Sequence, residues 1–253
     1  MPLATEYQAM FEQLAAAGPT PSVRDLPVAD GRALYRAARA VNPDLPIHNI
    51  SDASLPGPGG DIALRIYQPS GDGPFGILVY FHGGGWVIGD LDTADAVCRE
   101  IATLADLVVV SVDYRLAPEH LFPAAVEDSY AALKWVQDNV RALHGNGKIG
   151  VCGESAGGNL AAVVAQKNRD NEGPPIAFQC LLYPVTDAEM GRPSYRENSS
   201  GYLLETATME WFWDTYCPNP EQRLTSDASP LRASNLERLP PALVVTAEFD
   251  PLR

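Results

Sequence analysis

The chain has 253 residues, a length that corresponds to one large domain or to one domain with an accessory part. Its composition is 46% hydrophobic and 20% charged, which is typical of globular proteins and excludes disordered, collagenous and fibrous classes. With 18 Lys and Arg against 32 Asp and Glu, the net charge is −14, so phosphate backbones and anionic membrane surfaces would be repelled. We therefore expect neither a nucleic-acid nor a membrane partner.

The cysteines and the first residues indicate the compartment. The four cysteines lack the CxxC spacing of zinc and redox sites, and we interpret them as small hydrophobic residues in a reducing environment: Cys98, Cys152, Cys180 and Cys217. Glu6 and Glu12 stand where a signal peptide would have a positive start and an apolar stretch. We expect a cytoplasmic protein that uses no metal and no organic cofactor.

The first third of the chain predicts helices and then a hairpin. Apolar residues recur at three-four spacing around Met10 and around Leu34, so residues 1–45 are predicted to form a helical cap segment. Two strand-like runs follow, at 47–54 and 62–67, and the Pro and Gly-rich turn between them predicts an antiparallel hairpin.

From residue 77 onward, short apolar runs alternate with helical patterns. The runs cover residues 77–81, 107–112, 149–152, 176–183 and 242–249, and the clearest helical patterns cover 124–143 and 156–167. Strands that are apolar on both faces and are separated by helices predict βαβ units and a mostly parallel sheet, hence an α/β fold. We expect residues 46–253 to form this core, with 187–225 as an excursion that joins the cap.

The pentapeptide GESAG at 153–157 follows one of these strands and leads directly into a helical pattern. This is the context of a GxSxG nucleophile elbow, in which Ser155 occupies a strained turn and the glycines let strand and helix cross closely. Taken alone, the pentapeptide has an ordinary alternative, a glycine-flanked turn with an idle serine.

The run HGGGW at 82–86 follows the strand run 77–81. Three glycines after a strand allow backbone N–H groups to turn inward at close range, as stabilisation of an oxyanion requires. A flexible glycine turn is the alternative. We expect His82 to hold this loop by hydrogen bonds rather than to act as a base.

Together, the motifs resemble those of a known family. They are HGGGW at 82–86, DYRLAPEH at 113–120, GESAGG at 153–158, YP at 183–184, SPL at 229–231 and DPLR at 250–253. In this order they are similar to the hormone-sensitive-lipase-like serine esterases, in their bacterial branch. The resemblance implies an α/β-hydrolase fold with a helical cap. Within the second motif, we expect Arg115 and Glu119 to form an ion pair.

The resemblance also implies roles for individual residues. Ser155 would be the nucleophile, Gly83, Gly84 and Ala156 would donate oxyanion N–H groups, and Asp250 would be the acid of the triad. The residues themselves support Asp250, because Pro251 ends a strand and leaves the carboxylate at the carboxyl edge of the sheet, where ligands bind. A helix N-cap is the other reading of Asp250, and it does not exclude the first.

The histidine of the triad is the point at which the chain departs from the family. In α/β-hydrolases the histidine follows the acid, whereas the four histidines of this chain, His48, His82, His120 and His144, all precede Ser155. We expect these 253 residues to belong to a longer enzyme in which a further strand, the histidine and a closing helix follow Arg253. The 253 residues alone would then be nearly inactive.

The resulting functional prediction is a carboxylic-ester hydrolase that acts on small or short-acyl esters through a serine acyl-enzyme. An amidase or deacetylase would use the same residues, and a non-catalytic ligand receptor on the same fold is the alternative from another class. The expected partner is a small-molecule ester, and the expected state is a monomer or a homodimer.

Overall fold

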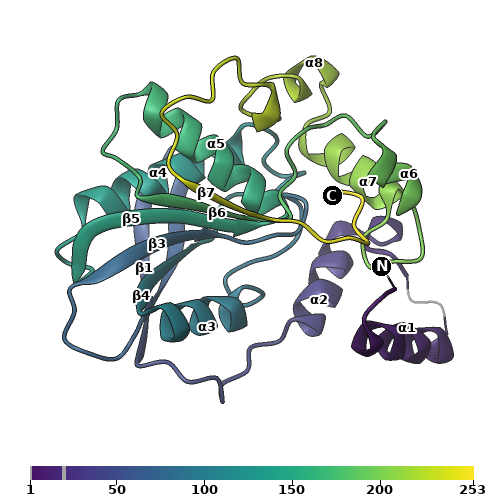
Figure 1. Ribbon diagram of the computed structural model, residues 1–253, viewed down its shortest axis with the longest axis horizontal. Coiled ribbons are helices and arrows are strands. Elements are labelled where there is room, and N and C mark those ends of the chain that lie inside the picture. The colour runs from purple at the N-terminus through teal and green to yellow at the C-terminus, as the bar shows by residue number, and fades with distance from the viewer. Residues whose placement is uncertain (1, 19–20) are drawn as a thin grey trace.

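A computed structural model describes residues 2–18 and 21–253 of the protein. Seven strands of this part form one sheet in the order β1-β2-β4-β3-β5-β6-β7 (Figure 1). Their bounds are β1 Asn49–Gly57, β2 Gly60–Gln68, β3 Phe75–Phe81, β4 Leu107–Val112, β5 Gly145–Glu154, β6 Phe178–Leu182 and β7 Ala242–Val245. The β1–β2 hairpin and the β2–β4 pair are antiparallel, and the remaining pairs are parallel. The predicted α/β class and the predicted hairpin are confirmed.

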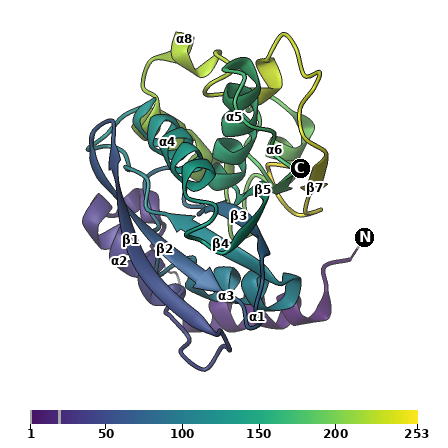
Figure 2. The same cartoon turned by 90° about the vertical axis from the view of Figure 1, so that its left-hand side faces the viewer.

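Helices cover both faces of this sheet (Figures 1 and 2). Helix α3 (Asp95–Ala105) packs on one face, while α4 (Ala124–Asp138) and α5 (Ala156–Asp170) pack on the other. Strands β3 and β4 are therefore buried on both sides, which explains their unbroken apolar sequences. The larger hydrophobic cluster lies on the α4–α5 side and the smaller one on the α3 side.

The remaining helices gather beyond one end of the sheet, on the right of Figure 1. They are α1 (Thr5–Ala17), α2 (Val28–Ala38), α6 (Pro193–Glu197) and α7 (Thr206–Tyr216), with α8 (Pro220–Arg223) and the short turns η1 (Val23–Asp25) and η2 (Pro230–Arg232) nearby in the chain. This is the end at which β5 finishes, because Arg39, next to α2, bonds the side chain of Glu154, the last residue of β5. Within the described residues, no helix has both the length and the apolar character needed to cross a membrane.

Three predicted elements are shorter in the structure: the strand predicted over 176–183 is β6, Phe178–Leu182, and two others end well before their predicted limits. The helix predicted over 124–143 ends at Asp138, where Asn139 caps it: the N–H of Asn139 is shared between Trp135 O and Val136 O, and its side-chain amide bonds Trp135 O at 2.8 Å. The strand predicted over 242–249 ends at Val245. Its partner strand β6 ends at Leu182, and Pro184, two residues later, has no N–H to extend the hydrogen-bonded ladder between β6 and β7.

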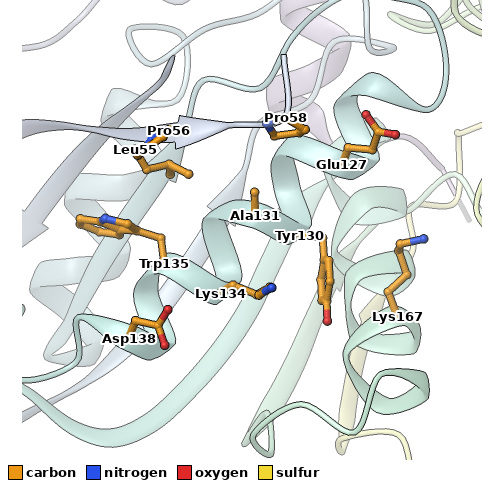
Figure 3. A pocket seen from close by; sticks show the side chains of 10 residues that line it. All are labelled: Leu55, Pro56, Pro58, Glu127, Tyr130, Ala131, Lys134, Trp135, Asp138 and Lys167. Carbon is orange, nitrogen blue, oxygen red and sulfur yellow. The ribbon is translucent and has the colours of Figure 1, made fainter. Parts of the chain in front are cut away.

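An open groove of about 510 Å³ lies between the β1–β2 hairpin, α4 and α5 (Figure 3). Trp135 and Tyr130 of α4 face it, as do Pro56 and Pro58 of the hairpin strand β1 and its turn. None of the predicted site residues lines this groove, so its size alone does not make it the functional site.

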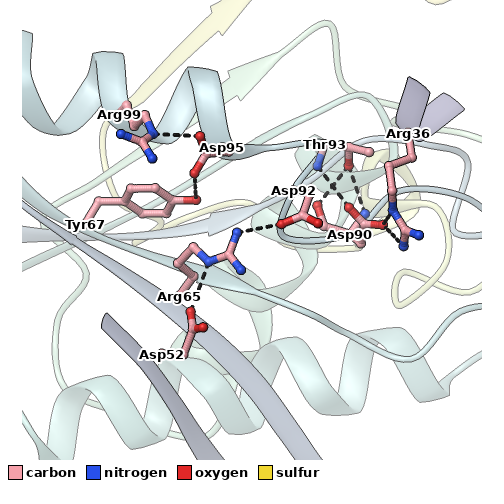
Figure 4. A network of polar contacts seen from close by, with 9 residues as sticks. All are labelled: Arg36, Asp52, Arg65, Tyr67, Asp90, Asp92, Thr93, Asp95 and Arg99. Atoms are coloured by element: carbon pink, nitrogen blue, oxygen red, sulfur yellow. Dashed lines mark hydrogen bonds and ion pairs between the residues drawn. The ribbon is translucent and has the colours of Figure 1, made fainter. Parts of the chain in front are cut away.

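A polar network joins the hairpin to α3 and to the loop before it (Figure 4). Arg65 of β2 bonds Asp52 at 3.0 Å and Asp92 at 2.8 Å, and Asp95 accepts bonds from Tyr67 at 3.0 Å and from Arg99 at 2.6 Å. The Arg65–Asp92 and Tyr67–Asp95 bonds join the antiparallel part of the sheet to α3 and to the loop before it.

Asp113, which follows β4, lies near this network without such a partner for its side chain among the described residues. Burial raises the pKa of Asp113 to about 6, and the negative charge of Asp90 adds to this, while Arg36 and Arg65 act in the opposite direction. In the folded state the carboxyl is therefore protonated over a pH range in which it is ionised when unfolded. Below about pH 4 the carboxyl of Asp113 is neutral in both states and does not destabilise the fold. As the pH rises from about 4 to about 6, the unfolded state loses this proton first, so the free energy of unfolding falls.

We predict that Asp113→Asn raises the free energy of unfolding at pH 8 by about 2 kcal/mol, because the amide carries no charge to desolvate. At pH 3.5 the variant and the parent should be equally stable. Urea unfolding at the two pH values measures this. Asp72→Asn, at an exposed position, is the control and should show no pH-dependent gain; an equal gain in both variants would contradict the assignment.

Candidate active site

Ser155 stands at a sharp turn between β5 and α5. Its φ of 54° and ψ of −118° are strained for a residue with a side chain. Three hydrogen bonds hold this conformation: Ser155 N–H donates to Leu182 O at 2.9 Å, and Ser155 O accepts from Asn159 N–H at 3.0 Å and Val185 N–H at 3.2 Å. The side chain is half-buried among buried neighbours, as a reactive hydroxyl at the mouth of a site would be.

Glycines let the surrounding backbones approach this turn closely. A Cβ on Gly157 would collide with the carbonyl oxygens of Phe81 and His82, and a Cβ on Gly153 would collide with the carbonyl of Gly157. Only glycine permits so close an approach between the backbone at the start of α5 and the backbone at the end of β3 and the loop after it. The two glycines flanking Ser155 are explained by this crossing.

The loop HGGGW begins directly after β3 and lies against the turn at Ser155. A Cβ on Gly83 would be 3.0 Å from Glu154 Cγ and 3.2 Å from Glu154 O, so Gly83 touches the residue that precedes Ser155. Gly84 and Gly85 have φ values of 118° and 58°, and Gly84 O accepts the N–H groups of Val87 and Ile88. This tight turn reverses the chain immediately beside the serine.

The structure brings the predicted oxyanion donors to the same place. Across the described chain, the N–H groups of Gly83 and Gly84 donate no hydrogen bond, and Ala156 begins α5, where the first N–H groups have no partner within the helix. Unpaired donors thus flank Ser155 from two directions, the loop after β3 and the N-terminus of α5. Such an arrangement can stabilise a negatively charged oxygen.

His82 is enclosed beneath this loop. Its Nδ1 lies 2.7 Å from Gly83 O, its ring stacks on Tyr114 at 4.3 Å, and the Tyr114 hydroxyl donates to His82 O at 2.7 Å. Burial lowers the pKa of His82, so the ring stays neutral and donates from Nδ1 to the carbonyl. These contacts fit the expectation that His82 holds the loop.

Asp250 lies at the same edge of the sheet, five residues beyond β7. Its Oδ1 accepts the N–H of Leu252 at 2.8 Å, and its carbonyl accepts the side-chain amide of Asn198 at 3.0 Å. Ser194 bonds the neighbouring Pro251 O at 2.8 Å, so the α6 segment supports this turn. Burial raises the pKa of Asp250, which Leu252 N–H opposes, and Oδ2 has no hydrogen-bond partner among the residues described.

Comparison with known proteins identifies the fold family. Residues 78–253 match the family model described as alpha/beta hydrolase fold. The chain belongs to the alpha/beta hydrolase fold family. Esterase LipI and carboxylic ester hydrolase LipN of Mycobacterium tuberculosis are 43% and 46% identical to it, over 90% and 88% of the chain and 74% and 61% of their own lengths. The hyperthermophilic esterase of Pyrobaculum calidifontis matches it with a TM-score of 0.92 and 45% identity, over 100% of this chain and 82% of that one. The predicted family and fold are confirmed.

The histidines of this alpha/beta hydrolase do not meet Ser155. His48 precedes β1 and His144 precedes β5, so both stand at the edge opposite the carboxyl ends of the parallel strands. His120 is at the correct edge but is exposed, and among the described contacts it bonds neither Ser155 nor Asp250. Within residues 2–18 and 21–253, no group of three or more His, Cys, Asp and Glu side chains is placed to hold a metal ion.

One sequence prediction about this hydrolase is wrong. Arg115 does not pair with Glu119. Instead, Arg115 binds Asp128 of α4 through two bonds of 2.8 Å, and Glu119 binds Arg32 of α2 at 2.7 and 2.8 Å. The reason is burial: Asp128 is fully buried under the loop and needs a cationic partner more than the half-exposed Glu119 does.

Three residues near the site of this hydrolase received no predicted role from the sequence. Arg39 bonds Glu154 Oε1 at 2.8 Å, Tyr183 bonds Glu154 Oε2 at 2.7 Å, and Tyr114 supports His82. Tyr114 and Tyr183 do belong to the quoted motifs, so their motifs could have marked them. Arg39 belongs to none, and only the folded chain places it there.

We predict that Gly157→Ala lowers the free energy of unfolding by at least about 3 kcal/mol, because the added methyl meets backbone oxygens that cannot move independently. Gly191→Ala is the matched control, since its Cβ would meet only the flexible end of Glu189, at 3.2 Å. Urea denaturation of both variants measures the difference. Similar stabilities for the two would show that the crossing at the elbow is not tight.

Proposed function

We propose that this alpha/beta hydrolase is a carboxylic-ester hydrolase that works through an acyl-enzyme on Ser155. The relatives carry the names esterase and carboxylic ester hydrolase, which supports the class of reaction. The observation that carries the proposal for this chain is the placement of Ser155 on a strained turn between two sets of unpaired N–H groups.

In the proposed reaction, Ser155 Oγ attacks the ester carbonyl and the carbonyl oxygen becomes an oxyanion. The N–H groups of Gly83, Gly84 and Ala156 hold that oxygen, an effect worth about 3 to 4 kcal/mol for each donor in known cases. The alcohol leaves with a proton, and water then attacks the acyl-enzyme and releases the acid. Asp250 would orient the base through Oδ2, which no described residue binds, and would stabilise the imidazolium.

The base itself is proposed to be a histidine outside these 253 residues. His82 is neutral, enclosed and committed to Gly83 O, and the other three histidines stand at the opposite edge or make no contact with the serine. If the mature protein has the mass of residues 1–253 alone and still hydrolyses esters at an ordinary rate, this part of the proposal fails.

Small acyl groups are the proposed substrates. A hollow of about 230 Å³ lies beside the Asp250 turn, lined by Pro184, Val244 and Pro251 among others. None of the predicted site residues lines it, so its volume does not set the length of the acyl group. On the other side, the ring of Phe212 in α7 occupies the space next to Gly85. We propose that α1 and α2 together with the 187–225 segment form the cap over this region.

The cysteines support a reducing compartment. Cys98, Cys152, Cys180 and Cys217 are all free thiols, and three of them are buried. We propose a cytoplasmic location and a monomeric or homodimeric state, both of which fractionation and size-exclusion chromatography would test.

In the mature protein, which on this proposal contains the base, we predict that Ser155→Ala lowers kcat for p-nitrophenyl acetate on the order of 10⁶-fold, because the nucleophile is removed. A fluorophosphonate probe should label the parent at Ser155 and leave the variant unlabelled. Ser129→Ala is the control: this buried serine bonds Ala125 O within α4, and its loss should leave the rate unchanged.

Matched substrates separate the remaining alternatives in the same assay. Acetyl and butyryl esters should react faster than a C16 ester, and an ester should react faster than its matched amide. A faster amide would indicate an amidase. Absence of both turnover and labelling in the mature protein would favour a ligand receptor.

A further inference from the structure

Helix α2 faces the catalytic edge with arginines that belong to none of the catalytic motifs. Arg32, Arg36 and Arg39 follow at spacings of four and three residues, which places them on one side of the helix and its end. Each binds a carboxylate of a different segment at the carboxyl edge. Arg32 binds Glu119, Arg36 binds Asp90 through Nε at 2.7 Å, and Arg39 binds Glu154 at 2.8 Å.

The third of these pairs differs from the other two because of its acid. Glu154 is the residue before Ser155, and its side chain is 8% exposed, against 54% for Glu119 and 20% for Asp90. Among the described residues, Arg39 is the one cation that contacts it. Burial of a carboxylate is costly without a partner, so Arg39 is needed for Glu154 to stay in place as a charged group.

Glu154 also joins the parts of the site to one another. Its Oε2 accepts the hydroxyl of Tyr183, which follows β6, and its Cγ and Oε1 form the surface on which Gly83 rests. Burial raises the pKa of Tyr183, and the charge of Glu154 adds to this, so the phenol keeps its proton and donates it to the carboxylate. The Glu154 side chain thus contacts both the oxyanion loop and the segment after β6, and Glu154 is the residue next to the nucleophile Ser155 in the chain.

Two further contacts hold Arg39 in place. It stands directly after α2, with its N–H bonded to Arg36 O at 3.2 Å, and its guanidinium lies over the ring of Tyr35 at 4.8 Å. The cation–π contact and the ion pair direct the side chain from the cap segment into the body of the enzyme.

We propose that Arg39 is a positioning residue that acts through Glu154 to set the distance between the oxyanion loop at Gly83 and the nucleophile Ser155. The N-terminal helical segment is then part of the catalytic geometry as well as a cover. This inference rests on the proposed esterase function. It goes beyond it in assigning a catalytic effect to a residue that touches neither the substrate nor the reacting atoms.

The test compares Arg39→Met with Arg36→Met, which removes an arginine of the same helix and an ion pair of the same kind but leaves Glu154 untouched. Arg39→Met should lower kcat by about tenfold to a hundredfold with KM changed less than about twofold, because misplaced oxyanion donors affect the transition state more than binding. Arg36→Met should change kcat by less than about twofold.

Two further variants separate positioning from loss of structure. Arg39→Lys keeps a cation near Glu154 and should recover part of kcat. Arg39→Met combined with Glu154→Gln removes the unpaired charge and should be more active than Arg39→Met alone. A kcat for Arg39→Met equal to that of Arg36→Met, in a parent that hydrolyses esters, would overturn the proposal.

Amide hydrogen exchange gives a readout that does not need activity. In Arg39→Met, peptides that contain the hydrogen-bonded N–H groups of Val87, Ile88 and Ser155 should exchange at least about tenfold faster than in the parent, while Arg36→Met should leave them unchanged. If the parent fails to hydrolyse esters, the proposed function falls and the exchange rates alone decide on Arg39. Unchanged exchange in Arg39→Met would overturn the inference in either case.

Discussion

Ser155 keeps a left-handed backbone because the elements around it allow no other path. Its N–H is bound to the end of β6, its carbonyl accepts bonds from the first turn of α5 and from the chain after β6, and the glycines on either side leave space for nothing but backbone. The strain at φ 54° costs on the order of 1 to 3 kcal/mol, which the packed core on both faces of β5 must offset. Everything else at this edge is arranged around that turn.

The second constraint is electrostatic. The chain carries 14 more acidic than basic residues, and several of the acids stand on the loops at the carboxyl edge. The arginines of α2 and its C-terminal end are therefore attracted to that edge, where Arg32 and Arg36 each pair with a loop carboxylate and Arg39 pairs with Glu154 of β5. The surface pairs contribute little individually, whereas the pair with the buried Glu154 leaves an uncompensated charge if it is broken.

The parts of this structure that the sequence predicts are those determined locally. HGGGW and GESAG encode their turns because glycine is needed at fixed offsets from a strand and a helix, and the apolar runs of β3 and β4 follow from burial on both faces. Contacts between residues that are far apart in the sequence cannot be predicted from local patterns in this way. Arg115 pairs with Asp128 rather than Glu119, and β7 ends at Val245, because of a buried helix and a proline that lie elsewhere in the chain. The role proposed for Arg39 has the same origin.

Two carboxylates at the catalytic edge have opposite surroundings. Both oxygens of Glu154 are engaged, one by Arg39 and one by Tyr183, so this group is suited to holding the loop and the turn in place. Asp250 has one oxygen bound to the N–H of Leu252, no cation in contact among the residues that the structure describes, and a pKa raised by burial. A carboxylate with a free oxygen in a poorly solvated place gains most from an N–H donor that can become positively charged, which is the property of an imidazole. The difference in partners, rather than the residue type, is what divides a supporting role from a catalytic one at this edge.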